Sequence, residues 1–203
     1  KSADPTIKIF IFDECDLFEE QHRRIIGGDL DLMGKDENGN WMVDGITFHR
    51  YPGAHDRNYV VFKAPHDIRV KTKKLMKMID YANNKHGREG EAKLLWGLTE
   101  FNVTTSNPDR EISGIGNTSF LGGQFIAEVY GIGMEYGAFT MTPWCISETD
   151  QLRTDFGFLG LPMDFLPRSS YYHTQLMALN MKGVFLRSES NNSFVYTIAS
   201  TLR

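Results

Sequence analysis

The chain has 203 residues, of which 41% are hydrophobic and 24% are charged, and its formal net charge is −4. This composition excludes disorder as the default state and permits one good-sized hydrophobic core. Because the chain has no long basic run and no apolar stretch of bilayer length, nucleic-acid and membrane partners are poor hypotheses.

Apolar segments of strand length alternate with longer segments of helical period. We expect strands at 7–12, 42–48, 93–98 and 138–142, where β-branched and aromatic residues cluster. A fifth strand pattern, at 194–198, has no helical pattern after it. Strands that alternate with helices are typical of parallel sheets joined by helical crossovers.

Four helices are expected between and after these strands. A short one is predicted at 19–26, and Asn117 or Thr118 is the expected N-cap of a later one. Three longer helices are indicated by apolar residues at helical spacing, namely Ile68, Leu75, Ile79 and Ala82; Leu121, Phe125, Val129 and Ile132; and Tyr172, Leu176 and Leu179.

The strand–helix units decide between two α/β architectures. A doubly wound sheet should carry a glycine-rich phosphate turn after its first strand, and residues 12–15 (Phe-Asp-Glu-Cys) are not such a turn. A complete (β/α)8 barrel has about 250 residues and eight units, so four units indicate half a barrel. We therefore expect a partial (β/α)8 TIM barrel at 1–187, followed at 188–203 by the first strand of an appended β-domain or by a tail.

The active site of a barrel lies at the carboxyl-terminal ends of its strands. Glu100 follows a nearly all-apolar strand, where a carboxylate must find partners or shift its pKa. Acids, hydrogen-bonding groups and flat rings in one place indicate a sugar-cleaving site; the alternative is a structural glutamate bonded to neighbouring backbone. The side chains at the expected strand ends are Asp13, Glu14, His49, Tyr51, Glu100, Asn102 and Trp144.

Five segments, in order along the chain, resemble one group of enzymes. Residues 98–102 (LTEFN) resemble the seventh-strand motif of clan A retaining glycosidases, closest to the family 39 group of β-xylosidases and α-L-iduronidases. Residues 46–52 (ITFHRYP) look like their sixth strand, and 138–144 (AFTMTPW) like the eighth. Residues 4–9 (DPTIKI) look like the start of the fifth strand, and 168–172 (RSSYY) like the start of the eighth helix. Related agarase-like enzymes degrade marine galactans, so the resemblance does not separate these substrates from xylan.

The resemblance implies a retaining double displacement with Glu100 as the nucleophile and with no cofactor or metal. The acid/base residue of such enzymes ends the fourth strand, which is expected upstream of this chain, and Glu14 is a disfavoured substitute for it. The histidine and tyrosine of the site would bind substrate hydroxyls or orient Glu100. The asparagine would fix the turn or contact sugar, and the tryptophan would stack on a pyranose ring. A secreted or periplasmic location also agrees with the resemblance. The substrate-binding residues implied are His49, Tyr51, Asn102, Trp144 and Glu14.

Three other interpretations stay open. A half barrel has unpaired sheet edges, so the chain is alternatively an inactive fragment that self-associates or pairs through those edges. A carbohydrate-binding module would use Trp144, Tyr51 and His49 and would not need Glu100. A barrel metallohydrolase is the least favoured because no His-x-His unit occurs, and its scattered ligands would be Asp13, Glu14, His49, His55 and Asp56.

Overall fold

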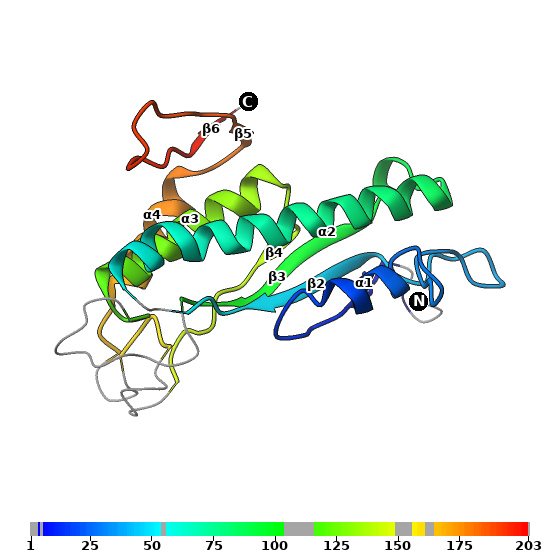
Figure 1. Cartoon of the computed structure of the whole chain (residues 1–203), viewed down its shortest axis with the longest axis horizontal. Helices are drawn as coiled ribbons and strands as arrows, with labels where there is room; N and C mark the ends of the chain where they lie inside the picture. The colour runs from blue at the N-terminus through cyan, green and yellow to red at the C-terminus, as the bar shows by residue number, and fades with distance from the viewer. Residues whose placement is uncertain are drawn as a thin grey trace.

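The computed structural model describes residues 4, 6–53, 56–103, 116–148, 156–160 and 165–202. At its centre lies a parallel sheet with the strand order β1-β2-β3-β4 (Figure 1). The expected α/β class with parallel strands is confirmed. Its strands are β1 (Phe10–Ile11), β2 (Gly45–Arg50), β3 (Leu95–Phe101) and β4 (Thr140–Met141), and the helices that follow them are α1 (Glu19–Ile25), α2 (Ala64–His86), α3 (Phe120–Glu135) and α4 (Ser169–Asn180).

Strands β2 and β3 form the middle of the sheet, and their side chains form its core. Ile46, Phe48 and Leu98 have no exposed surface, which is typical of parallel strands covered on both faces. A π-helical turn (Tyr59–Lys63) leads into α2, and a 3₁₀ turn (Gly90–Ala92) precedes β3.

Helices α2 and α3 bury the apolar stripes predicted for them. Ile68 and Leu75 on α2 and Val129 and Ile132 on α3 are all wholly buried. These stripes pack against the sheet because residues three and four apart lie on one face of a helix. The two long helices thereby fix the positions of the strands whose ends carry the expected site.

Helix α3 begins one or two residues later than the sequence predicts. Its N-cap is Ser119, whose Oγ accepts a hydrogen bond from the backbone N–H of Gly122 at 3.1 Å. Ser119 has the extended backbone that a capping residue needs, with φ −81° and ψ 169°. The prediction of Asn117 or Thr118 is therefore wrong: Asn117 is instead buried, with 1% of its surface exposed.

The C-terminal segment forms a small sheet at a different place from the predicted strand. Strand β5 (Val184–Leu186) pairs antiparallel with β6 (Ala199–Thr201), whereas residues 194–198 are assigned to no strand. Figure 1 shows this segment beyond α3 and α4, on the side away from the main sheet. Ile198 packs on Gly131 of α3 so closely that an added Cβ at Gly131 would lie 2.6 Å from its Cδ1. Packing on the helix thus takes the place of pairing in a sheet.

Helix α4 exposes the stripe that its sequence suggests for burial. Tyr172, Leu176 and Leu179 are 56%, 61% and 62% exposed. The helix packs on α3 through its other face, and the described residues do not cover this one. No helix of the described part of the chain is both long and apolar enough to span a membrane.

Candidate active site

Glu100 and His49 lie beside each other near the carboxyl-terminal ends of β3 and β2. The pairing of the two strands shifts register between Phe48 and His49, after which His49 is opposite Glu100. Such an irregularity re-aims the side chains that follow it. The structure therefore brings together two of the residues predicted from the strand ends.

One oxygen of the Glu100 carboxylate contacts two polar groups. Tyr51 Oη donates a hydrogen bond to Glu100 Oε2 at 2.8 Å, and His49 Nδ1 lies 3.3 Å from the same oxygen. No residue of the described part of the chain hydrogen-bonds to the other oxygen, Oε1. The Glu100 side chain keeps 29% of its surface exposed. The carboxylate is thus held at one oxygen and remains accessible.

Tyr51 is suited to donate and not to accept a proton at this site. Burial raises the pKa of its phenol strongly, and the hydrogen bond to Glu100 raises the pKa further. The phenol therefore stays protonated and keeps donating to the carboxylate. Its ring is fixed by an edge-to-face contact with Phe156, at 5.6 Å between ring centroids.

Asp13 completes the cluster, although the sequence gives more weight to its neighbour Glu14. His49 Nε2 lies 2.8 Å from Asp13 Oδ1, and Thr99 Oγ1 donates to the same oxygen at 2.5 Å. The hydrogen bond from Thr99 is the main cause that lowers the pKa of Asp13, and His49 lowers it further. The feature of the sequence that points to Asp13 is its position directly after the first apolar segment.

The backbone at the end of β1 places Asp13. Phe12 adopts φ +62°, a left-handed conformation that is uncommon for a residue with a side chain. Thr47 Oγ1 hydrogen-bonds to the carbonyl oxygen of Phe12, and the Phe12 ring stacks on His22 at 4.2 Å between centroids. These contacts hold a costly conformation at a site edge, where such strain is often found.

The ring of His49 therefore lies between two carboxylates. Both ring nitrogens face a carboxylate oxygen, at 2.8 Å for Asp13 and 3.3 Å for Glu100. The two carboxylates together fix the orientation of the imidazole ring.

Trp144 and Asn102 form a second part of the site, after β4 and β3. Trp144 is 41% exposed, and its Nε1 donates to Glu148 Oε1 at 3.2 Å. Asn102 is 1% exposed; its Nδ2 donates to the carbonyl of Trp144 at 2.7 Å and its Oδ1 accepts from the N–H of Val103. Asn102 is thus buried, and its bond to the Trp144 carbonyl helps to position Trp144.

Glu14 lies next to the cluster through its backbone. Its carbonyl oxygen accepts a hydrogen bond from the His49 N–H at 2.7 Å. In the described part of the chain its side chain makes no hydrogen bond with Glu100. Its negative charge acts on the pKa of His22 instead. Burial lowers the pKa of His22, and Glu14 partly opposes that effect.

An ion-pair network connects the elements that carry the site. Arg50, the last residue of β2, contacts Asp16 at 3.0 Å and Asp67 at 2.6 Å. Lys71 of α2 contacts the same Asp16 at 2.8 Å. The network ties the β1–α1 connection to β2 and α2, so the cluster rests on three elements at once.

His55, one of the candidate metal ligands, lies outside the described residues. Within the described ranges, no group of three or more His, Cys, Asp or Glu side chains is arranged to hold a metal ion.

No family model and no curated protein matches the chain. Its fold is similar in part to the family 44 endoglucanase Cel44A of Clostridium thermocellum, with 22% identity, a TM-score of 0.46, and coverage of 71% of this chain and 34% of that one. The structure of CbXyn10B matches at 16% identity and TM-score 0.41, with 82% and 47% coverage. A Faecalibacterium prausnitzii β-glucuronidase matches at 13% identity and TM-score 0.40, with 71% and 24% coverage. The chain thus spans less than half the length of each of these proteins. Similarity at this level does not identify its function.

Proposed function

We propose that the chain belongs to the catalytic domain of a retaining glycoside hydrolase, a partial (β/α)8 barrel in which Glu100 is the nucleophile. The observation that carries the proposal is the Glu100 carboxylate at the end of β3, contacted at Oε2 by Tyr51 and His49. A nucleophilic carboxylate must be positioned, and the contacts of Tyr51 and His49 at one oxygen serve this need.

In the proposed first step, Glu100 Oε1 attacks the anomeric carbon while the glycosidic carbon–oxygen bond breaks. A second carboxyl group gives its proton to the leaving oxygen, and a covalent glycosyl–enzyme forms. Water, deprotonated by that second group, then displaces Glu100 and releases the sugar with its anomeric configuration retained. Oε1 is the attacking atom because Oε2 is engaged by Tyr51.

Asp13 is a poor candidate for the second carboxyl group. A general acid needs a raised pKa, and hydrogen bonds from Thr99 and His49 lower the pKa of Asp13. His49 and Thr99 also both contact one oxygen of Asp13, Oδ1. We therefore propose that the acid/base residue lies outside this cluster, upstream of the chain as the family resemblance implies.

Trp144 supplies a surface for the sugar ring. Its indole is partly exposed, and Glu148 fixes its orientation through the ring N–H. A flat ring held in this way is a platform for the apolar face of a pyranose. The resemblance to family 39-like and agarase-like enzymes points to xylan and marine galactans as the first substrates to try.

The test compares the full-length protein with its Glu100→Gln variant in reducing-sugar release from xylan, agar and porphyran. Loss of the nucleophile should reduce release by about 10³-fold or more, with an unchanged melting temperature. ¹H NMR of the first product should show the retained anomer. Release that survives Glu100→Gln would refute the nucleophile assignment, whereas binding without release from either protein would favour a carbohydrate-binding module.

A further inference from the structure

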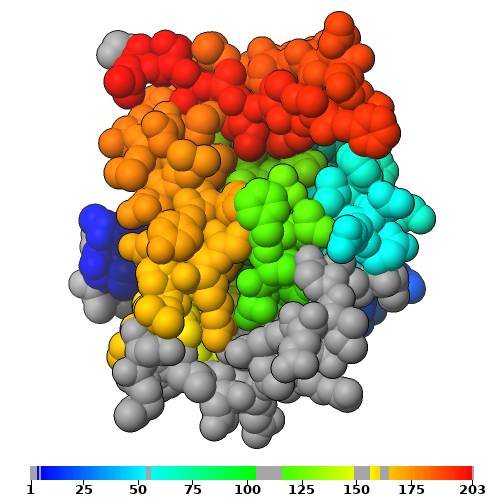
Figure 2. Space-filling model, turned by 90° about the vertical axis from the view of Figure 1, so that its left-hand side faces the viewer, coloured from blue at the N-terminus to red at the C-terminus, as the bar shows by residue number. Residues whose placement is uncertain are grey.

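A cavity of about 1090 Å³ lies among α2, α3, α4 and the C-terminal segment that carries β5 and β6. Figure 2 shows this segment (red) across the top of the molecule, next to α4 (orange), α3 (green) and the start of α2 (cyan). None of the residues that line the cavity belongs to the Glu100 cluster. The cavity is therefore separate from the proposed active site.

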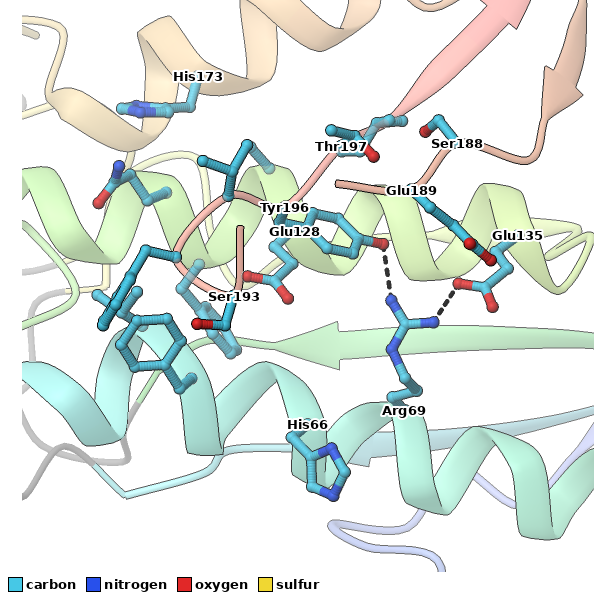
Figure 3. Close-up of a pocket in the computed structure, with 18 of the residues that line it drawn as sticks. His66, Arg69, Glu128, Glu135, His173, Ser188, Glu189, Ser193, Tyr196 and Thr197 are labelled. Carbon is cyan, nitrogen blue, oxygen red and sulfur yellow. Dashed lines mark hydrogen bonds and ion pairs between the residues drawn. The ribbon is translucent and has the colours of Figure 1, made fainter. Parts of the chain in front are cut away.

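The arginines of the cavity wall are already paired. Arg69 Nη2 donates to Tyr196 Oη at 2.7 Å, and Arg69 Nη1 pairs with Glu135, as the dashed lines of Figure 3 show. Arg187 Nε donates to Glu189 at 2.9 Å. Both guanidinium groups thus already pair with an acid of the same wall, which weakens their attraction for an anionic ligand.

Glu128 is the acid of the wall that has no such partner. It projects from α3 among the lining side chains of Figure 3, and it makes no hydrogen bond with any residue the structure describes. Burial raises the pKa of Glu128 to about 7, and Arg69 opposes this effect. A neutral carboxyl group both donates and accepts hydrogen bonds, which matches a hydroxyl group. In its charged form it repels anions.

Three aromatic rings stand at the same cavity with much of their surface exposed. Phe62, Tyr196 and Phe194 are 39%, 42% and 79% exposed. Phe62 and Phe194 meet edge to face, with 5.8 Å between their centroids. Gln124, exposed on α3, adds an amide that donates and accepts. Flat apolar rings beside a few polar groups are typical of small-molecule sites.

We propose that this cavity is a second carbohydrate site that binds a neutral oligosaccharide. Phe62 and Phe194 contact the apolar faces of its sugar rings, and Glu128 and Gln124 hydrogen-bond to its hydroxyl groups. The choice of a sugar rests on the proposed function, whereas the cavity and its chemistry do not depend on Glu100. A site of this kind would hold a polysaccharide on the enzyme while another part of it is cleaved.

The test uses the full-length protein with Glu100→Gln and Trp144→Ala, which prevent cleavage and weaken binding at the active site. Its migration is measured in native gels that contain soluble β-1,4-xylan or agarose, with polygalacturonate as the anionic contrast. We expect retardation by a neutral glycan and not by polygalacturonate. Adding Phe194→Ala or Glu128→Leu should weaken the apparent affinity at least about 5-fold.

Phe139→Ala is the matched control, because Phe139 is 57% exposed and does not line this cavity. If Phe194→Ala or Glu128→Leu lowers the melting temperature, Gln124→Ala provides the same test at an exposed position. Unchanged retardation in the cavity variants, or no retardation of the parent by either neutral glycan, overturns the proposal. If retention depends on Phe194 but the protein with Glu100 and Trp144 intact releases no sugar, the hydrolase function is refuted and this second site still stands.

Discussion

His49 has one ring nitrogen toward Asp13 and the other toward Glu100, so Asp13 is placed to position Glu100 through the histidine. We predict that Asp13→Asn lowers kcat by about 10-fold or more, because an amide no longer holds the orientation of the His49 ring. The pH profile of kcat should also change, because the variant lacks the Asp13 carboxylate, whose pKa is lowered in the cluster. Rates measured over a range of pH check both effects.

Asp29→Asn is the control for this change. Asp29 is an exposed aspartate whose pKa is lowered by a hydrogen bond from Arg24, and it is far from the cluster in sequence. Its replacement should leave kcat and the pH profile as they are. A purely structural Asp13 would give a less stable protein with the wild-type pH profile, and that result would contradict the positioning role.

Glu128 gives a prediction about stability and pH. Its pKa is about 7 in the folded chain, against 4.5 for an ordinary glutamate, so the folded state binds more protons between these values. The free energy of unfolding should therefore fall as pH rises from about 4.5 to 7, by up to about 3 kcal/mol from this group. Urea unfolding of wild type and Glu128→Gln at several pH values tests this. Equal pH dependence in both proteins would assign the effect to other groups.

At the scale of elements, the start of α3 shows how a helix end is set by backbone conformation. Ser119 caps the helix through its bond to Gly122, and Ser119→Ala should lower the free energy of unfolding by about 1 kcal/mol. Ser193→Ala, at an exposed serine of the C-terminal segment, should change it little. Denaturant midpoints measure both, and an equal loss in the two variants would count against this cap.

The helices and strands were predictable to the extent that their burial follows a period. The stripes of α2 and α3 face the core, and their apolar spacing states this directly. The strand predicted at 194–198 is absent because β-branched and aromatic residues favour a strand only when a partner strand is present. In the structure these residues pack on α3 and line a cavity instead.

The candidate site was predictable where it depends on topology alone. Parallel strands end at one edge of a sheet, so residues near the carboxyl-terminal ends of β2 and β3 had to meet, as His49 and Glu100 do. The choice between Asp13 and Glu14 depends on the left-handed conformation of Phe12, which no local pattern of the sequence indicates. The role of Asn102 depends on burial, since both ends of its amide are used within the chain.

At the scale of the whole molecule, apolar side chains remain exposed near both edge strands of the main sheet. Ile7 and Ile9, before β1, are 50% and 36% exposed, and Phe139, beside β4, is 57% exposed. The outer stripe of α4 follows β4 in the chain and is exposed as well. Edge strands with exposed apolar neighbours are sites where chains pair.

We therefore propose that the 203-residue chain on its own associates with a second copy through these edge strands and the exposed stripe of α4. Replacing Leu176 and Leu179 by Glu should lower the association constant by about 10-fold or more, because it puts charges on the apolar stripe of α4. Leu202→Glu, at an equally exposed leucine near the C-terminus, is the control. Sedimentation over a range of concentrations measures the association. A wild-type chain that stays folded and monomeric at high concentration would show that the open edges are tolerated, because unpaired backbone and apolar groups can then be solvated without driving assembly.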